Sequence, residues 1–278
     1  MWTDRAAVLD DVSAGDWVRP RLGRWTTVTG LLPGGFEAYA RVLHPVVGAL
    51  PDAPDDAPWA PLRWADVAAV TGRTLHPLVQ WHRLVGGDDA DPSDPDTALW
   101  PHGRPAEGHL ALPQLTALCR ALAPHTATAD RCLMAVWEGW GALNGGSVRM
   151  TVVDGRVART EPVPRAFTDA EWDAPRFRLP ARDYLLVAGP LDAVVDVARG
   201  PGDGDGQSPA LIWPQDRAWC VGTEVDHDST LVGGTREAVA AVLAEPALEA
   251  FPVGPDDPLA FDGDTVNAPS DAPGAGRS

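Results

Sequence analysis

Hydrophobic residues recur at two different spacings along this chain, one typical of strands and the other of helices. Alternate positions are apolar in residues 34–47, which predicts a strand that ends near His44. In residues 109–126, leucines recur every three or four positions, which predicts a helix with Pro113 in its first turn. Residues 132–137 are apolar throughout, so we expect a central strand that is covered on both faces.

The other apolar segments predict further short strands and helices. Residues 148–160 are expected to form a hairpin that turns at Asp154 and Gly155. Residues 183–198 predict a buried strand followed by a helix, and Thr235 is expected to cap the start of a later helix. Additional helices are expected at 63–72, 74–87 and 247–253, and additional strands at 208–214 and 217–225.

The order of these elements indicates the fold class. Helices and strands are intermixed without a regular βαβ repeat, and no internal repeat of solenoid length is visible. The pattern therefore predicts an α+β fold, with a single mixed or mainly antiparallel sheet and helices packed on it. A chain of 278 residues with 45% apolar residues can fill a sizeable core, and we assign residues 1–253 to one globular domain.

The formal charge of −17 is unevenly distributed along the chain. Four segments, 51–58, 86–98, 200–208 and 254–278, hold 15 acids and one base, and so contribute −14. We interpret the first three as solvated loops and the last as a disordered acidic tail rich in proline and glycine. An acidic chain of this kind favours neither nucleic acid nor an anionic membrane as a partner.

The predictions of the cellular compartment and of cofactors rest on sequence patterns that are absent from the chain. The first residues show no basic segment followed by an apolar one, and no apolar run is long enough to span a bilayer. Three cysteines without C-x-x-C spacing are expected to be buried, reduced thiols, so we predict a cytoplasmic protein. The chain contains no lysine and no G-x-G-x-x-G run, so we expect neither a Walker A loop nor any other cofactor site.

The segment 217–235, RAWCVGTEVDHDSTLVGGT, places three acids, Glu224, Asp226 and Asp228, within five positions. If it is extended, Glu224 and Asp226 lie on the face opposite the apolar side chains, and Asp228 continues that face. Two interpretations follow. The carboxylates are either solvent-facing, with Asp228 binding backbone amides in a turn, or they converge on a cation or a sugar hydroxyl in the room left by small residues.

Other candidate residues are an acid, several tryptophans and a histidine. Glu138 follows the central strand and stands between Trp137 and Trp140, where burial beside indole rings would raise its pKa toward the range of a general acid. Twelve tryptophans, Trp213 among them, serve either as core anchors or as the lining of a binding surface. His76 would share a helical face with Gln80 and Arg83 if residues 74–87 are helical. No histidine pair has metal-ligand spacing.

Four runs together resemble a functionally uncharacterised family of proteins from high-GC bacteria. They are WTTVTGLLPGGFEAYARVLHPV, HPLVQWHRL, CLMAVWEGWG and RAWCVGTEVDHDSTLVGGT, at 25–46, 76–84, 132–141 and 217–235. The resemblance implies that the four runs belong to one fold. It implies no activity.

Two functions of different classes remain open from the sequence. The first is a cytoplasmic binding protein of regulatory or immunity type that acts on a protein partner, with Trp137, Trp140, Trp213, His76 and Asp228 as candidate binding residues. The second is a hydrolase or transferase that uses Glu138, Glu224 and Asp226, with or without a divalent cation. The second requires these carboxylates to meet in one concave pocket.

Overall fold

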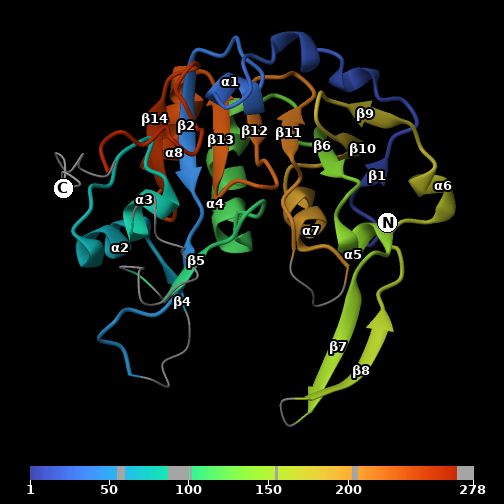
Figure 1. The fold of residues 1–278 in the computed structure, drawn as a ribbon. Coiled ribbons are helices and arrows are strands. Elements are labelled where there is room, and N and C mark those ends of the chain that lie inside the picture. The colour runs from blue at the N-terminus through green and yellow to red at the C-terminus, as the bar shows by residue number, and fades with distance from the viewer. Residues whose placement is uncertain (55–59, 87–99, 101, 154–155, 202–205, 268–278) are drawn as a thin grey trace, which may run out of the picture.

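A large antiparallel sheet forms the centre of the molecule in the computed structural model, which describes residues 1–54, 60–86, 100, 102–153, 156–201 and 206–267 (Figure 1). The strand order is β1–β10–β6–β11–β12–β13–β2–β14, and β9 pairs with β10 beside β1. The strands of this sheet are β1 Ala7–Val8, β2 Ala38–Leu43, β6 Cys132–Trp137, β9 Arg176–Arg178, β10 Asp183–Gly189, β11 Leu211–Pro214, β12 Cys220–Gly222, β13 Ser229–Gly234 and β14 Glu249–Val253. This architecture is the α+β class that the sequence predicts.

Three helices cover one face of the sheet: α4 Leu112–Leu122, α7 Ala193–Arg199 and α8 Arg236–Ala244. Their apolar side chains pack on one set of alternate strand residues, which includes Met134 and Val221. The other face is covered by residues 9–36, which hold the short helix α1 Val28–Leu31 and the 3₁₀ turns η1 Ser13–Gly15 and η2 Arg19–Arg21. The sheet is therefore buried on both faces, as the continuous apolar run of residues 132–137, now β6, predicts.

A smaller unit packs beside the edge of the sheet that β2 and β14 form. It consists of the strands β3 Val46–Gly48, β4 Ala60–Leu62 and β5 Gly103–Pro105 with the helices α2 Trp64–Thr71 and α3 Trp81–Val85. Trp64 and Trp100 are fully buried in its separate core. The Trp64 indole Nε1 donates to the carbonyl of His44 at 2.8 Å, which fixes this unit to the end of β2.

The hairpin of β7 Val148–Val153 and β8 Arg156–Pro162 extends away from the body as a separate two-stranded sheet (Figure 1). We call these two strands the arm. The arm leaves the body after the short helix α5 Gly141–Asn144 and returns to it before α6 Asp169–Trp172. The hairpin expected at 148–160 is therefore present, while its turn residues lie outside the described part of the chain.

Local sequence patterns correctly placed several other elements. Gly72 ends α2 in a left-handed conformation, with φ of 68°, and Pro113 stands in the first turn of α4. The hydroxyl of Thr235 accepts a hydrogen bond from the amide of Ala238 at 3.2 Å, which is the predicted helix cap of α8.

The Thr235→Ala variant is expected to lose about 1 kcal/mol of folding free energy, because the first turn of α8 loses its capping acceptor. Chemical denaturation of this variant beside Thr235→Ser, which keeps the hydroxyl, measures the effect. Equal stability of the alanine and serine variants would contradict the capping role.

Several predicted elements were wrong, and each error has a tertiary cause. Residues 249–253 form the edge strand β14 rather than a helix, because they pair with β2 along its whole length. In 74–87 only Trp81–Val85 are helical, so His76 lies before the helix and shares no helical face with Arg83. The strand expected at 217–225 ends at Gly222, and the chain turns back to form β13, which the sequence analysis missed.

The boundary placed after residue 253 was also wrong. The chain continues as ordered structure to residue 267, with Leu259, Asp264 and Asn267 buried. The Asp264 carboxylate accepts hydrogen bonds from His76, from the amide of Gln80 and from Asn267, which holds this segment on the body. The predicted acidic loops fall mainly on residues 55–59, 87–99 and 202–205, and the rest of the tail on 268–278, all outside the described residues.

None of the helices in the described part of the chain has the length and apolar character needed to cross a bilayer.

Candidate functional site

The acidic segment that follows β12 is built around an arginine. Arg182, just before β10, donates from Nε to Glu224 Oε1 at 2.8 Å and pairs through a second nitrogen with Asp226. Its guanidinium also lies over the ring of Trp137, 4.9 Å from the centroid. Glu224 and Asp226 are therefore brought together as predicted, but a cation of the protein itself stands between them.

The space expected beside the small residues of β12 is occupied by the chain itself. A side chain at Gly222 would meet Leu32 Cδ1 at 3.1 Å and the carbonyl oxygen of Leu31 at 3.2 Å. Gly222 therefore allows α1 to pack closely on the sheet. The described residues therefore leave no room for a ligand directly over Gly222, and a ligand near Glu224 must enter from the side.

Asp228 does not share this arginine. Its Oδ1 lies 3.4 Å from Nη2 of Arg41, a residue of β2 with only 2% of its side chain exposed. Burial raises the pKa of Asp228, although the charge of Arg41 acts in the opposite direction. Arg41 also donates to the hydroxyl of Ser229 at 2.9 Å and to the carbonyl of Val79 at 2.7 Å. Asp228 thus belongs to a buried polar network that joins β2 and β13 to the segment before α3.

Glu138 is held apart from Glu224 by the sheet. Its Oε2 accepts from Arg176 Nε at 2.8 Å, and Arg176 stacks over Trp172. Trp172 packs against the core on the helix-covered face, whereas Trp137, under Arg182, packs against the core on the opposite face. Each carboxylate therefore has its own arginine on its own side of the sheet. The structure does not bring Glu138 and Glu224 into one concave pocket.

The remaining predicted residues lie at separate places. Trp213 is buried and packs edge-on against Trp17, with ring centroids 6.0 Å apart, as a core anchor. Trp140 is partly buried in the core on the helix side. His76 Nε2 lies 2.8 Å from Asp264 Oδ1, and its Nδ1 accepts from the amide of Leu78 at 3.3 Å. Trp137, Trp140, Trp213 and His76 do not form one surface.

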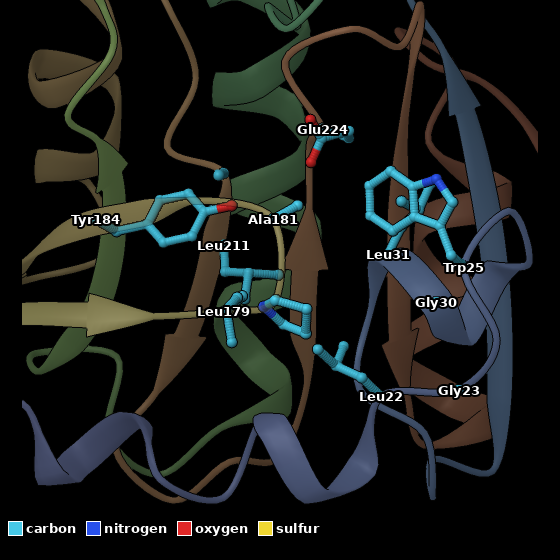
Figure 2. A pocket seen from close by; sticks show the side chains of 12 residues that line it. Leu22, Gly23, Trp25, Gly30, Leu31, Leu179, Ala181, Tyr184, Leu211 and Glu224 are labelled. Carbon is cyan, nitrogen blue, oxygen red and sulfur yellow. The ribbon is translucent and has the colours of Figure 1, made fainter.

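A pocket opens beside Glu224, between α1 and the β9–β10 connection (Figure 2). Its walls include Leu22, Leu31 and Leu211, and Tyr184 and Glu224 supply its polar groups. Tyr184 was not predicted as a site residue from the sequence, because it lies within a buried apolar strand. Arg182 was not predicted either, because an arginine 42 residues from Glu224 in the chain leaves no local signal.

The arm forms a second candidate surface. Register pairs Val148 with Pro162 and Met150 with Thr160, so these side chains share one face. After an irregularity between Thr151 and Val152, Val157 returns to that face. The exposed fractions are 56% for Val148, 59% for Met150 and 57% for Val157. The arm is thus an amphipathic ribbon whose apolar face is open to solvent.

Within the described residues, no group of three or more His, Cys, Asp and Glu side chains is arranged to hold a metal ion. Comparisons with protein-family models, with curated proteins and with solved structures found no match to this chain. The geometry of the pocket and of the arm is therefore what bears on the function.

Proposed function

We propose that this protein acts by binding a protein partner, and that the arm is the part that docks. The observation that carries the proposal is the open apolar face of Val148, Met150 and Val157. A two-stranded hairpin alone is marginally stable in water, and none of the described arm residues belongs to a core cluster of the body. A partner that covers this face would remove apolar surface from water and stabilise the arm.

The charge of the arm favours an acidic partner surface with an apolar strip. Residues 147–165 carry four arginines and two acids, net +2, so the rest of the chain carries −19. On the face opposite Met150, Arg159 is paired with Glu161. Arg149, on the same face, has a side chain long enough to reach carboxylates at the rim of an interface formed by the Met150 face. A protein is a better fit than nucleic acid, because an apolar strip on a protein can cover Val148, Met150 and Val157, whereas a phosphate backbone offers no apolar surface to them.

The cytoplasm is the compartment that we propose for this interaction. Cys119, Cys132 and Cys220 are all free and buried. Burial raises the pKa of Cys119 and of Cys132 to about 12, so these thiols are protonated and unreactive at neutral pH. Unpaired thiols of this kind are typical of proteins that fold in a reducing compartment.

Replacing Val148, Met150 and Val157 together by threonine is expected to weaken partner binding by at least about tenfold, because the apolar contact is lost. Threonine keeps the strand propensity of the arm. The partner is first identified by a photo-crosslinking amino acid placed at Met150 in cells. Titration calorimetry with the purified partner then gives the dissociation constants of the wild type and the variant.

Val47→Thr and Val70→Thr make a matched control, because both valines are exposed, at 44% and 45%, and lie outside the arm. The control is expected to bind the partner as the wild type does. Crosslinks from Met150 only to a second copy of this chain, or to nucleic acid, would overturn the proposal. So would equal losses of affinity in the arm variant and in the control.

A further inference from the structure

The pocket beside Glu224 has a polar end and apolar walls. Leu22, Leu31, Leu179 and Leu211 supply most of the wall, and Figure 2 shows the Tyr184 hydroxyl pointing into the space below the Glu224 carboxylate. Trp25 stands on the side opposite Tyr184, at the mouth, with 52% of its surface exposed. This combination of apolar walls with a few converging polar groups is typical of small-molecule sites.

The chain holds Trp25 at the mouth through contacts with residues 255–259. Leu259 donates its amide to the carbonyl of Thr26 at 2.7 Å, and Thr29 donates to the carbonyl of Pro255 at 3.0 Å. Thr26 has a φ of 74°, a left-handed conformation that is costly for a β-branched residue. The wall that carries Trp25 is thus held by long-range hydrogen bonds and not by the backbone conformation that Thr26 would prefer by itself.

Two polar atoms of the pocket remain without partners in the described part of the chain. Tyr184 is only 4% exposed, and its hydroxyl makes no hydrogen bond with any described residue. Glu224 has 11% of its side chain exposed and uses Oε1 for Arg182, while Oε2 accepts no hydrogen bond from the described residues. Both residues line the pocket, so one donor group of a bound ligand can reach the Tyr184 hydroxyl and Glu224 Oε2 together.

The charges around the pocket select the head group of that ligand. Of the described residues that line it, Glu224 alone is charged. Arg182 stands behind Glu224 and is shared with Asp226, so the three side chains together carry −1. An anionic head would face a carboxylate with no lining cation. A positively charged N–H donor would instead form a charge-assisted hydrogen bond to Oε2 and could lie against the indole of Trp25.

The size of the pocket limits the body of the ligand. Its volume is about 180 Å³. Sites for drug-sized molecules span roughly 300–1,000 Å³, whereas a cavity of about 150 Å³ is enough for one benzene ring. We propose that this pocket binds a small apolar amine, with its ammonium between Glu224 and Tyr184 and its hydrocarbon part against the leucines. This site is separate from the arm and does not depend on the proposed partner.

Three probes of nearly equal shape test the head group: benzylamine, benzyl alcohol and benzoate. Titration calorimetry with the full chain is expected to give tightest binding for benzylamine, at least about tenfold weaker binding for benzyl alcohol, and no binding for benzoate. Benzylamine should also raise the melting temperature, because it binds the folded state. Equal affinity for amine and alcohol, preference for benzoate, or no binding of millimolar benzylamine would overturn the proposal.

Single variants then test whether benzylamine binds in this pocket. Glu224→Gln is expected to weaken benzylamine by at least about tenfold and benzyl alcohol much less, while Tyr184→Phe should weaken both by a few-fold. The matched control is Glu245→Gln, since Glu245 also pairs with an arginine at 2.8 Å and has 10% of its side chain exposed, but lies at the end of α8. Ala181→Trp, at the exposed rim, should block entry without disturbing the core. Unchanged benzylamine affinity in Glu224→Gln and Ala181→Trp, or equal losses in Glu224→Gln and Glu245→Gln, would contradict this site.

Discussion

The Arg41→Met variant is expected to lose about 3–5 kcal/mol of folding free energy, the range found when one partner of a buried ion pair is removed. Arg41 is 2% exposed and bonds to Asp228, Ser229 and the carbonyl of Val79. Methionine fills similar space but leaves Asp228, only 20% exposed, without its cation. Urea denaturation at neutral pH measures the loss.

The double variant Arg41→Met with Asp228→Asn is expected to be more stable than Arg41→Met alone, because the uncompensated carboxylate is removed. Arg236→Met is the control, since Arg236 is exposed and its guanidinium Nη1 lies 3.9 Å from Glu37 Oε2, so a loss below about 1 kcal/mol is expected. A loss in Arg41→Met no larger than in this control would contradict a structural role for the network of Asp228.

His44 lies at the end of β2 in a fully buried chain of hydrogen bonds. Its Nδ1 lies 2.7 Å from the carbonyl of Ala106, which can only accept, so Nδ1 carries the proton. Its Nε2 must then accept from the hydroxyl of Thr230 at 2.9 Å, and Thr223 lies 2.8 Å from that hydroxyl. Burial, more than the nearby charges, lowers the pKa of His44 from 6.5 to about 3.

This depressed pKa predicts acid destabilisation. Between pH 6.5 and about 3 the unfolded chain binds a proton at His44 that the folded protein does not, so folding stability falls as pH falls. The loss approaches about 1.4 kcal/mol for each pH unit, and it fades above pH 6.5, where the imidazole becomes neutral in the unfolded state as well. Denaturation curves recorded from pH 7 to pH 4 measure this slope.

His44→Gln is expected to be less stable than the wild type at pH 7 but to lose most of this slope. Burial also lowers the pKa of His227, and hydrogen bonds acting against burial lower the pKa of Glu171, Asp216 and Asp264, so a slope of the same sign remains in the variant. His102→Gln is the control and should retain the wild-type slope. If His44→Gln kept the full slope, the acid sensitivity would have to arise elsewhere.

Part of the candidate site was visible in the sequence. Alternation correctly put Trp219 and Val221 on one core face, and Glu224 and Asp226 do lie together. The partners that decide what these carboxylates do were not visible. Arg182 is 42 residues from Glu224, Arg41 is 187 residues from Asp228, and His76 is 188 residues from Asp264. No periodicity over a few residues can report such pairs.

The sequence by itself determined the elements whose hydrophobic spacing is set by their own neighbours: the central strand β6, the helix α4, the capped helix α8 and the hairpin of the arm. Only the tertiary structure decided that residues 249–253 are a strand, because β2 offers them a free edge for pairing. It also decided that Tyr184 and Glu224 face a common pocket. Spacing reflects local backbone geometry, whereas strand pairing and pocket walls depend on which distant segments fold against each other.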